Sequence, residues 1–239
     1  MCSGHHYSRR DFLRISASTA AGAVLAGCSG LSVAKPAATA EPAIKTGNAA
    51  LSRLLEGNKR YAAYKSTDVN ETKARRAEVA KGQKPFATIL GCVDSRVPPE
   101  LVFDRGLGDL FVIRTAGQVV DKAVLGSLEF GVAELKIPLL MVLGHEKCGA
   151  INATIEAVEK NAKAEAEIAY LVENLRPVVE KAKERTGDKL DNAVRVNVEM
   201  AVSTLRSLPF FAEFIHKGEL RIVGARYDLD SGLVEVTVP

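Results

Sequence analysis

The chain is poor in sulfur-containing and aromatic residues. It has no tryptophan, three methionines and four cysteines among 239 residues, and aromatic residues make up 5% of it. So few cysteines exclude a framework of several disulfides. Two of them, Cys2 and Cys28, lie within the first 40 residues. Beyond that segment Cys92 and Cys148 are the remaining thiols, so we expect no structural disulfide unless these two pair with each other.

The chain also lacks an excess of charge of either sign beyond its first 40 residues. Its formal charge of +3 arises from 32 basic and 29 acidic residues, and residues 1–40 hold four of the basic and one of the acidic residues. The remainder has 28 of each and is formally neutral. An extended nucleic-acid-binding surface should be markedly basic, so we expect no nucleic-acid partner.

A membrane-spanning helix is missing from the N-terminal leader. Residues 15–27 are mildly apolar but too few to span a bilayer, which takes about 20 residues. The preceding stretch, Ser8-Arg9-Arg10-Asp11-Phe12-Leu13-Arg14, resembles a twin-arginine export signal. We therefore expect residues 1–40 to comprise an export signal and the start of a linker, and the protein to be exported to the periplasm.

Two cleavage sites fit this leader. Leu25-Ala26-Gly27-Cys28 resembles a lipobox and would leave Cys28 as a lipid-modified N-terminus. Ala38-Thr39-Ala40 would instead suit an ordinary signal peptidase. We favour the lipobox because a cysteine at position 28 otherwise has no use. Any attachment to a membrane would then run through this lipid alone.

Residues 41–239 read as one α/β domain. Short apolar runs at 86–90, 110–114, 138–144 and 220–223 predict buried strands, and helical spacing between them predicts crossover helices. This alternation indicates a parallel central sheet with flanking helices. Asp230-Ser231-Gly232 predicts a turn into an antiparallel edge strand at 233–238. We further expect a helix bent or broken near Pro177, and another capped by Asp191.

Chemistry-bearing residues follow two of the predicted strands. Cys92, Asp94 and Arg96 alternate after the first strand, and His145 and Cys148 follow the third. Side chains two apart at a strand end point the same way, and we expect one turn at a helix start to bring His145 and Cys148 to a common centre. Two thiolates and one imidazole would hold one zinc ion per chain and leave its fourth position open, as in catalytic zinc sites.

Charge suggests a role for the other two residues. Zinc held by two thiolates is formally neutral, so it should acidify a bound water less than zinc held by three imidazoles. We expect Asp94 to accept a hydrogen bond from that water or hydroxide, and Arg96 to hold Asp94 ionised and aligned. A surface salt bridge between Asp94 and Arg96 is the plainer alternative.

The pair of motifs, Cys-x-Asp-x-Arg at 92–96 and His-x-x-Cys-Gly at 145–149, resembles the signature of β-class carbonic anhydrases. The resemblance runs from about Asn48 to the end of the chain. It implies zinc-dependent hydration of carbon dioxide to bicarbonate by a metal-held hydroxide, in a homodimer or tetramer. By position it also assigns Gln83, Phe111 and Phe130 to the substrate pocket, with Gln83 and Phe130 serving the partner's zinc.

Other functions fit the same signature. An enzyme of this scaffold could hydrolyse carbonyl sulfide or carbon disulfide, and pocket access would decide between the gases. A bicarbonate-binding or zinc-binding protein without turnover is a third reading, against which Asp94, Arg96 and Gln83 count. Some members of the family have a non-catalytic bicarbonate pocket that uses a tryptophan. This chain has no tryptophan, which counts against that form of inhibition here.

Overall fold

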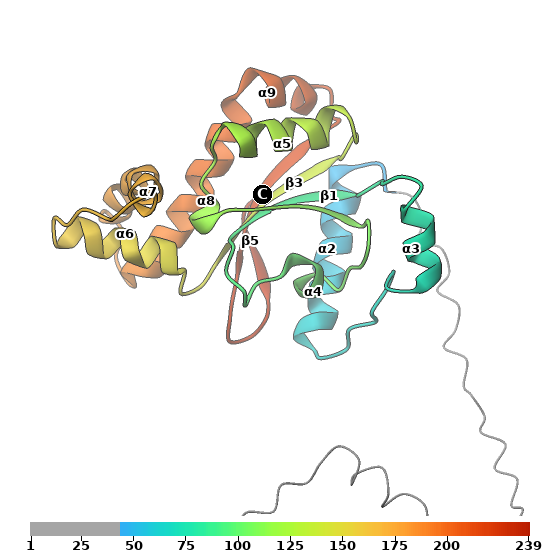
Figure 1. Ribbon diagram of the computed structural model, residues 1–239, viewed down its shortest axis with the longest axis horizontal. Coiled ribbons are helices and arrows are strands. Elements are labelled where there is room, and N and C mark those ends of the chain that lie inside the picture. The colour runs from blue at the N-terminus through green and yellow to red at the C-terminus, as the bar shows by residue number, and fades with distance from the viewer. Residues whose placement is uncertain (1–43) are drawn as a thin grey trace, which may run out of the picture. The chain divides into compact units, whose positions relative to one another are not determined.

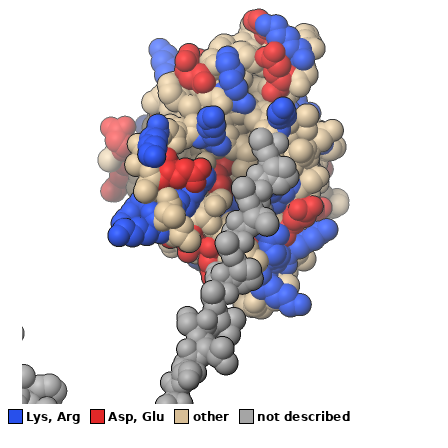
Figure 2. Space-filling model, turned by 90° about the vertical axis from the view of Figure 1, so that its right-hand side faces the viewer, with Lys and Arg blue, Asp and Glu red and all other residues tan. Residues whose placement is uncertain are grey.

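A computed structural model describes residues 44–239 of the chain (Figure 1). Cys28, both predicted cleavage sites and most of the predicted linker lie outside the described residues. Within 44–239, no helix combines the length and the apolar character that a membrane crossing requires. On the face drawn in Figure 2, Lys and Arg side chains are interspersed with Asp and Glu side chains.

A five-stranded sheet forms the centre of the fold. Its strands are β1 (Ala87–Gly91), β2 (Leu110–Arg114), β3 (Leu139–His145), β4 (Arg221–Tyr227) and β5 (Val234–Val238). Their order is β2-β1-β3-β4-β5, in which the first four are parallel and β5 runs antiparallel to β4. The predicted α/β class, parallel sheet and antiparallel edge strand are therefore confirmed.

Helices cover both faces of the sheet, so its central strands are buried on both sides (Figure 1). The helical elements are α2 (Gly47–Ala62), α3 (Lys73–Val79), α4 (Pro99–Val102), η1 (Ala116–Gln118), α5 (Lys122–Ala133), α6 (Gly149–Glu159), α7 (Ile168–Ala182), α8 (Lys189–Ser207) and α9 (Pro209–His216). Ile89 packs into the core beneath α2 and α4, whereas its neighbour Leu90 packs into the core beneath α5, α8 and α9. This alternation is the period of two that a strand imposes.

A third apolar cluster lies beyond the carboxyl ends of the strands. It joins α6, α7 and α8, and contains Leu175, Val178 and Val194 together with Cys92 and Cys148. The candidate site is therefore built into a packed core rather than onto an exposed loop.

Of the bend or break predicted near Pro177, the break is wrong. Helix α7 runs without interruption from Ile168 to Ala182. Pro177 is exposed, as is Glu173 one turn before it, so the carbonyl that loses its N–H partner can bind water instead. Leu175 and Val178 are buried on either side, and their packing keeps the helix continuous past the proline.

The prediction that Asp191 caps a helix is also wrong. The N-cap of α8 is Asp188, whose side chain accepts a hydrogen bond from the backbone N–H of Asp191 at 2.7 Å. Asp191 lies in the first turn of α8, where a carboxylate complements the helix dipole. The capping signal was placed three residues too late because both aspartates fit the composition of a helix start.

Candidate metal centre

The three candidate metal ligands converge at the carboxyl ends of two neighbouring strands. Cys92 follows β1, His145 is the last residue of β3, and Cys148 directly precedes α6. Their potential ligand atoms all lie within 4.8 Å of one another. The residues are buried, with exposed fractions of 5% for Cys92, 0% for His145 and 2% for Cys148. The structure thus brings the two motifs together around one point.

The route by which His145 and Cys148 meet differs from the prediction. We expected one helical turn to carry both, but His145 belongs to β3, and Cys148 is the non-helical N-cap of α6, with φ −66° and ψ 117°. The reason is the pairing of β3 with β4, which continues until His145 lies opposite Tyr227. Lys147 then takes a left-handed conformation, with φ 52°, that turns the chain toward α6.

His145 presents one ring nitrogen to the two sulfur atoms. Its Nδ1 lies 2.8 Å from the carbonyl oxygen of Glu146. Because a carbonyl only accepts, the proton is assigned to Nδ1, and Nε2 is left as an acceptor. Nε2 is buried and has no hydrogen-bond partner among residues 44–239. An unsatisfied buried polar atom destabilises the fold, and a metal ion at this point would satisfy it.

The two thiols affect each other's ionisation in opposite directions. Hydrogen bonding with Cys148 lowers the pKa of Cys92 in spite of its burial, and the same contact, together with burial, raises the pKa of Cys148. A divalent cation would allow both sulfurs to ionise and act as ligands. Two thiolates and an imidazole suit zinc and disfavour magnesium or calcium, which prefer oxygen ligands.

Asp94 and Arg96 form a two-pronged ion pair beside the ligands. Nε of Arg96 donates to Oδ1 of Asp94 at 2.9 Å, and Nη2 donates to Oδ2 at 2.7 Å. These hydrogen bonds hold the pKa of Asp94 at about 2, so its carboxylate is ionised at neutral pH. Oδ2 of Asp94 also lies 3.9 Å from Nε2 of His145. The carboxylate is therefore adjacent to the point where the ligand atoms meet.

Arg114, the last residue of β2, is a site residue that the motifs did not indicate. Its Nε donates to the carbonyl of Cys92 at 2.7 Å, and its Nη2 donates to the carbonyl of Asp94 at 2.6 Å. These bonds hold the backbone on both sides of Val93. One signal was available, since the carboxyl ends of parallel strands share an edge, but no spacing rule indicates that this side chain reaches back to Cys92.

The segment that carries His145 and Cys148 is held by the turn between β4 and β5. The N–H of Glu146 donates to the carbonyl of Tyr227 at 3.0 Å. The Glu146 carboxylate in turn accepts from the N–H of Leu229 at 3.2 Å. The motifs gave no indication of these contacts, because Glu146 reads as a solvated residue between two ligands.

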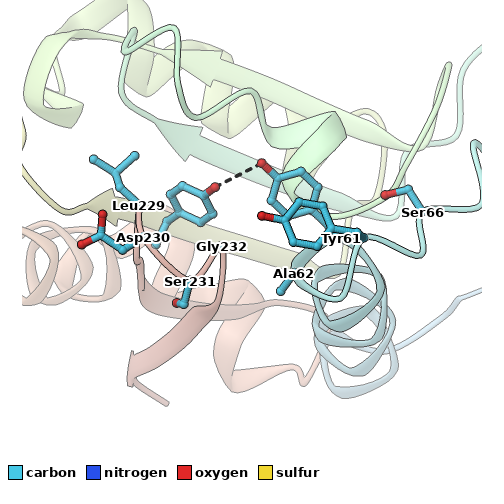
Figure 3. Close-up of a pocket in the computed structure, with 9 residues that line it drawn as sticks. Tyr61, Ala62, Ser66, Leu229, Asp230, Ser231 and Gly232 are labelled. Atoms are coloured by element: carbon cyan, nitrogen blue, oxygen red, sulfur yellow. Dashed lines mark hydrogen bonds between the residues drawn. The ribbon is translucent and has the colours of Figure 1, made fainter.

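A cavity of about 360 Å³ lies between that turn and the end of α2 (Figure 3). The hydroxyl groups of Tyr61 and Tyr227 lie 3.2 Å apart at its wall. Asp230 lies on its rim and pairs with Lys147 at 3.1 Å. The turn is thereby linked to the metal-binding segment at the surface as well as through the buried backbone.

Of the three residues assigned to the substrate pocket, two are in ring contact with each other in this chain. The rings of Phe111 on β2 and Phe130 on α5 have centroids 6.4 Å apart, and Phe130 is 48% exposed. Gln83 is exposed in the loop before β1 and makes no side-chain hydrogen bond to any of residues 44–239. Phe111 and Phe130 are thus neighbours, while Gln83 is not joined to the metal-binding residues by a hydrogen bond.

Comparison with known proteins gives one consistent result. The sequence profile described as carbonic anhydrase matches residues 87–234, and that of the twin-arginine translocation signal matches residues 6–26. Carbonic anhydrase 2 of Mycobacterium tuberculosis (strain CDC 1551 / Oshkosh) is 42% identical over 185 residues, which are 77% of this chain and 89% of that protein.

Solved structures show the same relationship. The β-carbonic anhydrase of Coccomyxa, solved in complex with acetazolamide, aligns with a TM-score of 0.61 and 31% identity over 78% of this chain and 85% of that one. A tetrameric β-carbonic anhydrase of Sordaria macrospora aligns with a TM-score of 0.62 over 78% of this chain and 95% of that one. At 24% sequence identity, this match shows similarity of fold only.

Proposed function

The chain belongs to the β-class carbonic anhydrase family, and from that premise we propose that it catalyses the reversible hydration of carbon dioxide to bicarbonate and a proton. The observation that carries the proposal is the buried group of Cys92, His145 and Cys148 with the Asp94 carboxylate beside it. A structural zinc site has four protein ligands. Three protein ligands leave one position of a tetrahedral ion for water or substrate, as in catalytic sites.

One zinc ion per chain fits this group. The buried Nε2 of His145 has no partner within residues 44–239, and two adjacent sulfurs require a cation before both can ionise. When bound, zinc would supply a Lewis acid that makes water nucleophilic near neutral pH. Cys92, His145 and Cys148 would hold the ion, and every other contribution comes from side chains and backbone of this chain.

Asp94 would act as the hydrogen-bond acceptor that orients the attacking water. The carboxylate is ionised because Arg96 donates to both of its oxygens. A carboxylate that only accepts selects the water orientation in which one proton faces Asp94 and a lone pair faces the carbon atom of the substrate. Arg96 also donates to the carbonyl of Lys147 at 3.2 Å and so positions Asp94 relative to both motifs.

We also propose that the substrate pocket is completed in a homo-oligomer. Phe130 is 48% exposed, and Leu110–Arg114 of the edge strand β2 are half-buried throughout. Phe111 and Phe130 would form the apolar wall for carbon dioxide, and Gln83 would donate a hydrogen bond to a substrate oxygen at the partner's metal. A dimer or tetramer would bring these exposed groups to a site that one chain leaves open.

The twin-arginine signal indicates export across the cytoplasmic membrane. We propose that the mature enzyme works in the periplasm, that residues 41–239 form its catalytic domain, and that a lipid on Cys28 anchors it. Mass spectrometry of the mature N-terminus tests the anchor, since a diacylated Cys28 and a free Glu41 differ in both sequence and mass.

The proposed activity is tested by stopped-flow hydration of carbon dioxide on the purified chain, with zinc content measured on the same sample across pH. We expect one zinc per chain and fast turnover that disappears when a chelator removes the metal. Zinc at full occupancy without turnover at any pH would overturn the proposal. Carbonyl sulfide and carbon disulfide, assayed in parallel, show whether a sulfur-containing gas is then the substrate.

A further inference from the structure

Two buried amide side chains lie behind Cys92 and have no part in the reaction proposed above. Gln118 in η1 is 4% exposed and Asn197 in α8 is 7% exposed. Burial of a primary amide is unfavourable unless its donors and acceptor find partners. An apolar pair of similar size would pack at this position more simply, so the contacts that the two amides make need a reason.

The pair makes two hydrogen bonds to the backbone around the site and one between its own side chains. Nδ2 of Asn197 donates to the carbonyl of Gly117 at 2.8 Å and to Oε1 of Gln118 at 3.0 Å. Nε2 of Gln118 donates to the carbonyl of Leu143 at 3.0 Å. The amide pair therefore connects three elements, namely α8, η1 and the end of β3. Asn197 lies 80 and 79 positions from its partners Gly117 and Gln118, and Gln118 lies 25 positions from Leu143.

The backbone held in this way is strained. Gly117 has φ 63° and ψ 22°, and Gln118 has φ 55°, so two consecutive residues are left-handed. A residue with a side chain, such as Gln118, is disfavoured in this region. Gly117 suits this left-handed position, and a Cβ there would lie 2.8 Å from Cδ1 of Leu175, so that side chain would have to shift.

The result of this strained conformation is a hydrogen bond to a metal ligand. The N–H of Gly117 points at Sγ of Cys92, at an N···S distance of 3.5 Å. The N–H and the carbonyl of Gly117 are related by the φ and ψ angles of that residue, so holding the carbonyl while Gly117 is left-handed fixes the direction of the N–H. A hydrogen bond to a thiolate withdraws electron density from the sulfur and restrains its direction, and such outer contacts tune a metal site.

We propose that Asn197 and Gln118 are positioning residues that hold the N–H of Gly117 against the sulfur of Cys92 and thereby set the strength of the Cys92–metal bond. This inference rests on the proposed function, because it assumes that Cys92 binds zinc. The predicted effect is on metal binding by Cys92, so it can be measured without measuring turnover. The competing view is that the amide pair merely stabilises the packing of α8 on η1.

Asn197→Leu removes both donated hydrogen bonds and keeps the branching of the side chain, with two methyl groups in place of the amide oxygen and nitrogen. Val202→Ala is the matched control, because Val202 is also buried in α8 but packs into the cluster beneath α5 and α9. In the purified full chain loaded with cobalt(II), we expect Asn197→Leu to move the sulfur-to-metal charge-transfer absorption to longer wavelength, because a sulfur without its hydrogen bond is richer in electrons. We expect zinc affinity, measured by chelator competition, to fall about 10- to 100-fold.

Val202→Ala should reduce thermal stability and leave the absorption band and the zinc affinity unchanged. If Asn197→Leu does not fold, Asn197→Ser retains one hydroxyl donor and should give a smaller shift in the same direction. An unchanged band and affinity in the folded Asn197 variant, or equal changes in Val202→Ala, would overturn the proposal. Both readouts can be made even if the protein does not hydrate carbon dioxide, so failure of the inference and failure of the proposed function are distinguishable.

Discussion

The two ligand-bearing segments differ in how they are held in place. The first segment, residues 92–96, has a local brace in addition to the distant hydrogen bonds from Arg114, since the Arg96 side chain donates twice to Asp94 two residues earlier. The second segment, residues 145–148, is held from a distance by the turn at 227–230. The first arrangement can be read from neighbouring letters in the sequence, whereas the second exists only in the folded chain.

The contacts that hold the second segment continue into a network of partly buried ion pairs centred on Arg226. Arg226 is 8% exposed, and its guanidinium contacts the carboxylates of Asp191, Glu146 and Asp228. Arg195 also pairs with Asp191, at 2.8 Å. The difference between the segments teaches that the ligand at the end of β3 depends on α8 and β4 being docked, while the Asp94–Arg96 pair does not.

The largest expected effect comes from a ligand of the second segment. Cys148→Ser replaces a thiolate with a hydroxyl that remains protonated at neutral pH, so we expect loss of the metal and of carbon dioxide hydration. Zinc content by elemental analysis and stopped-flow hydration test this on one sample. A variant that stays fully zinc-loaded and active would refute the assignment of Cys148 as a ligand.

Asp94→Asn separates chemistry from metal binding in the first segment. The amide cannot serve as a pure acceptor, so we expect turnover to fall about 10²-fold or more while zinc content stays near that of the parent. Asp230→Asn is the matched control, because Asp230 is an exposed carboxylate that pairs with Lys147 in the other segment. Turnover close to that of the parent in Asp94→Asn would remove Asp94 from the mechanism.

Arg226→Met tests the distant brace. It leaves Asp191 and Glu146 partly buried without their shared cation, so the free energy of unfolding should fall by about 2–3 kcal/mol. Urea denaturation monitored by circular dichroism measures this loss. Arg176→Met, which breaks an exposed pair with Glu173, should cost less than about 0.5 kcal/mol. Equal losses in the two variants would mean that the second segment does not depend on buried charge.

The smallest expected effect is a dependence of folding stability on pH, through Asp191. Burial raises the pKa of Asp191, but hydrogen bonds and charge from Arg195 and Arg226 outweigh it and lower that pKa below 3.8. A lowered pKa in the folded state contributes stability that is present above the unfolded pKa and is lost as pH falls through the folded pKa. The stability difference between the parent and Asp191→Asn should therefore be constant near pH 7 and shrink below about pH 4, as measured by urea denaturation at each pH.

Much of the fold was predictable because its signals are local. The apolar run at 110–114 coincides with β2, and the turn at 230–232 leads into β5 as expected. Predictions near helix ends were weaker. Pro177 lies inside α7 because packing of Leu175 and Val178 outweighs the missing hydrogen bond, and Asp188 rather than Asp191 caps α8 because the cap depends on backbone geometry.

The residues of the candidate site also fall into two groups, those that the sequence predicted and those that it did not. Cys92, His145 and Cys148 were all predicted to meet, since parallel strands place their carboxyl ends at one edge. Arg114, Gln118 and Asn197 were missed, because each reaches the site through a hydrogen bond to the backbone of a distant segment. Such a bond depends on where a carbonyl or an N–H points, and residue type carries no record of that direction.

The sequence by itself determined the alternation of strands and helices and the pairing of Asp94 with Arg96, because a spacing of two residues translates directly into side-chain direction. It also indicated that Cys92, His145 and Cys148 converge, since they follow parallel strands. The tertiary structure alone decided that the N–H of Gly117 faces the sulfur of Cys92 and that the turn after β4 holds Glu146. Those contacts join residues 25 and 83 positions apart. They form only when packed layers bring particular backbone atoms within hydrogen-bonding distance.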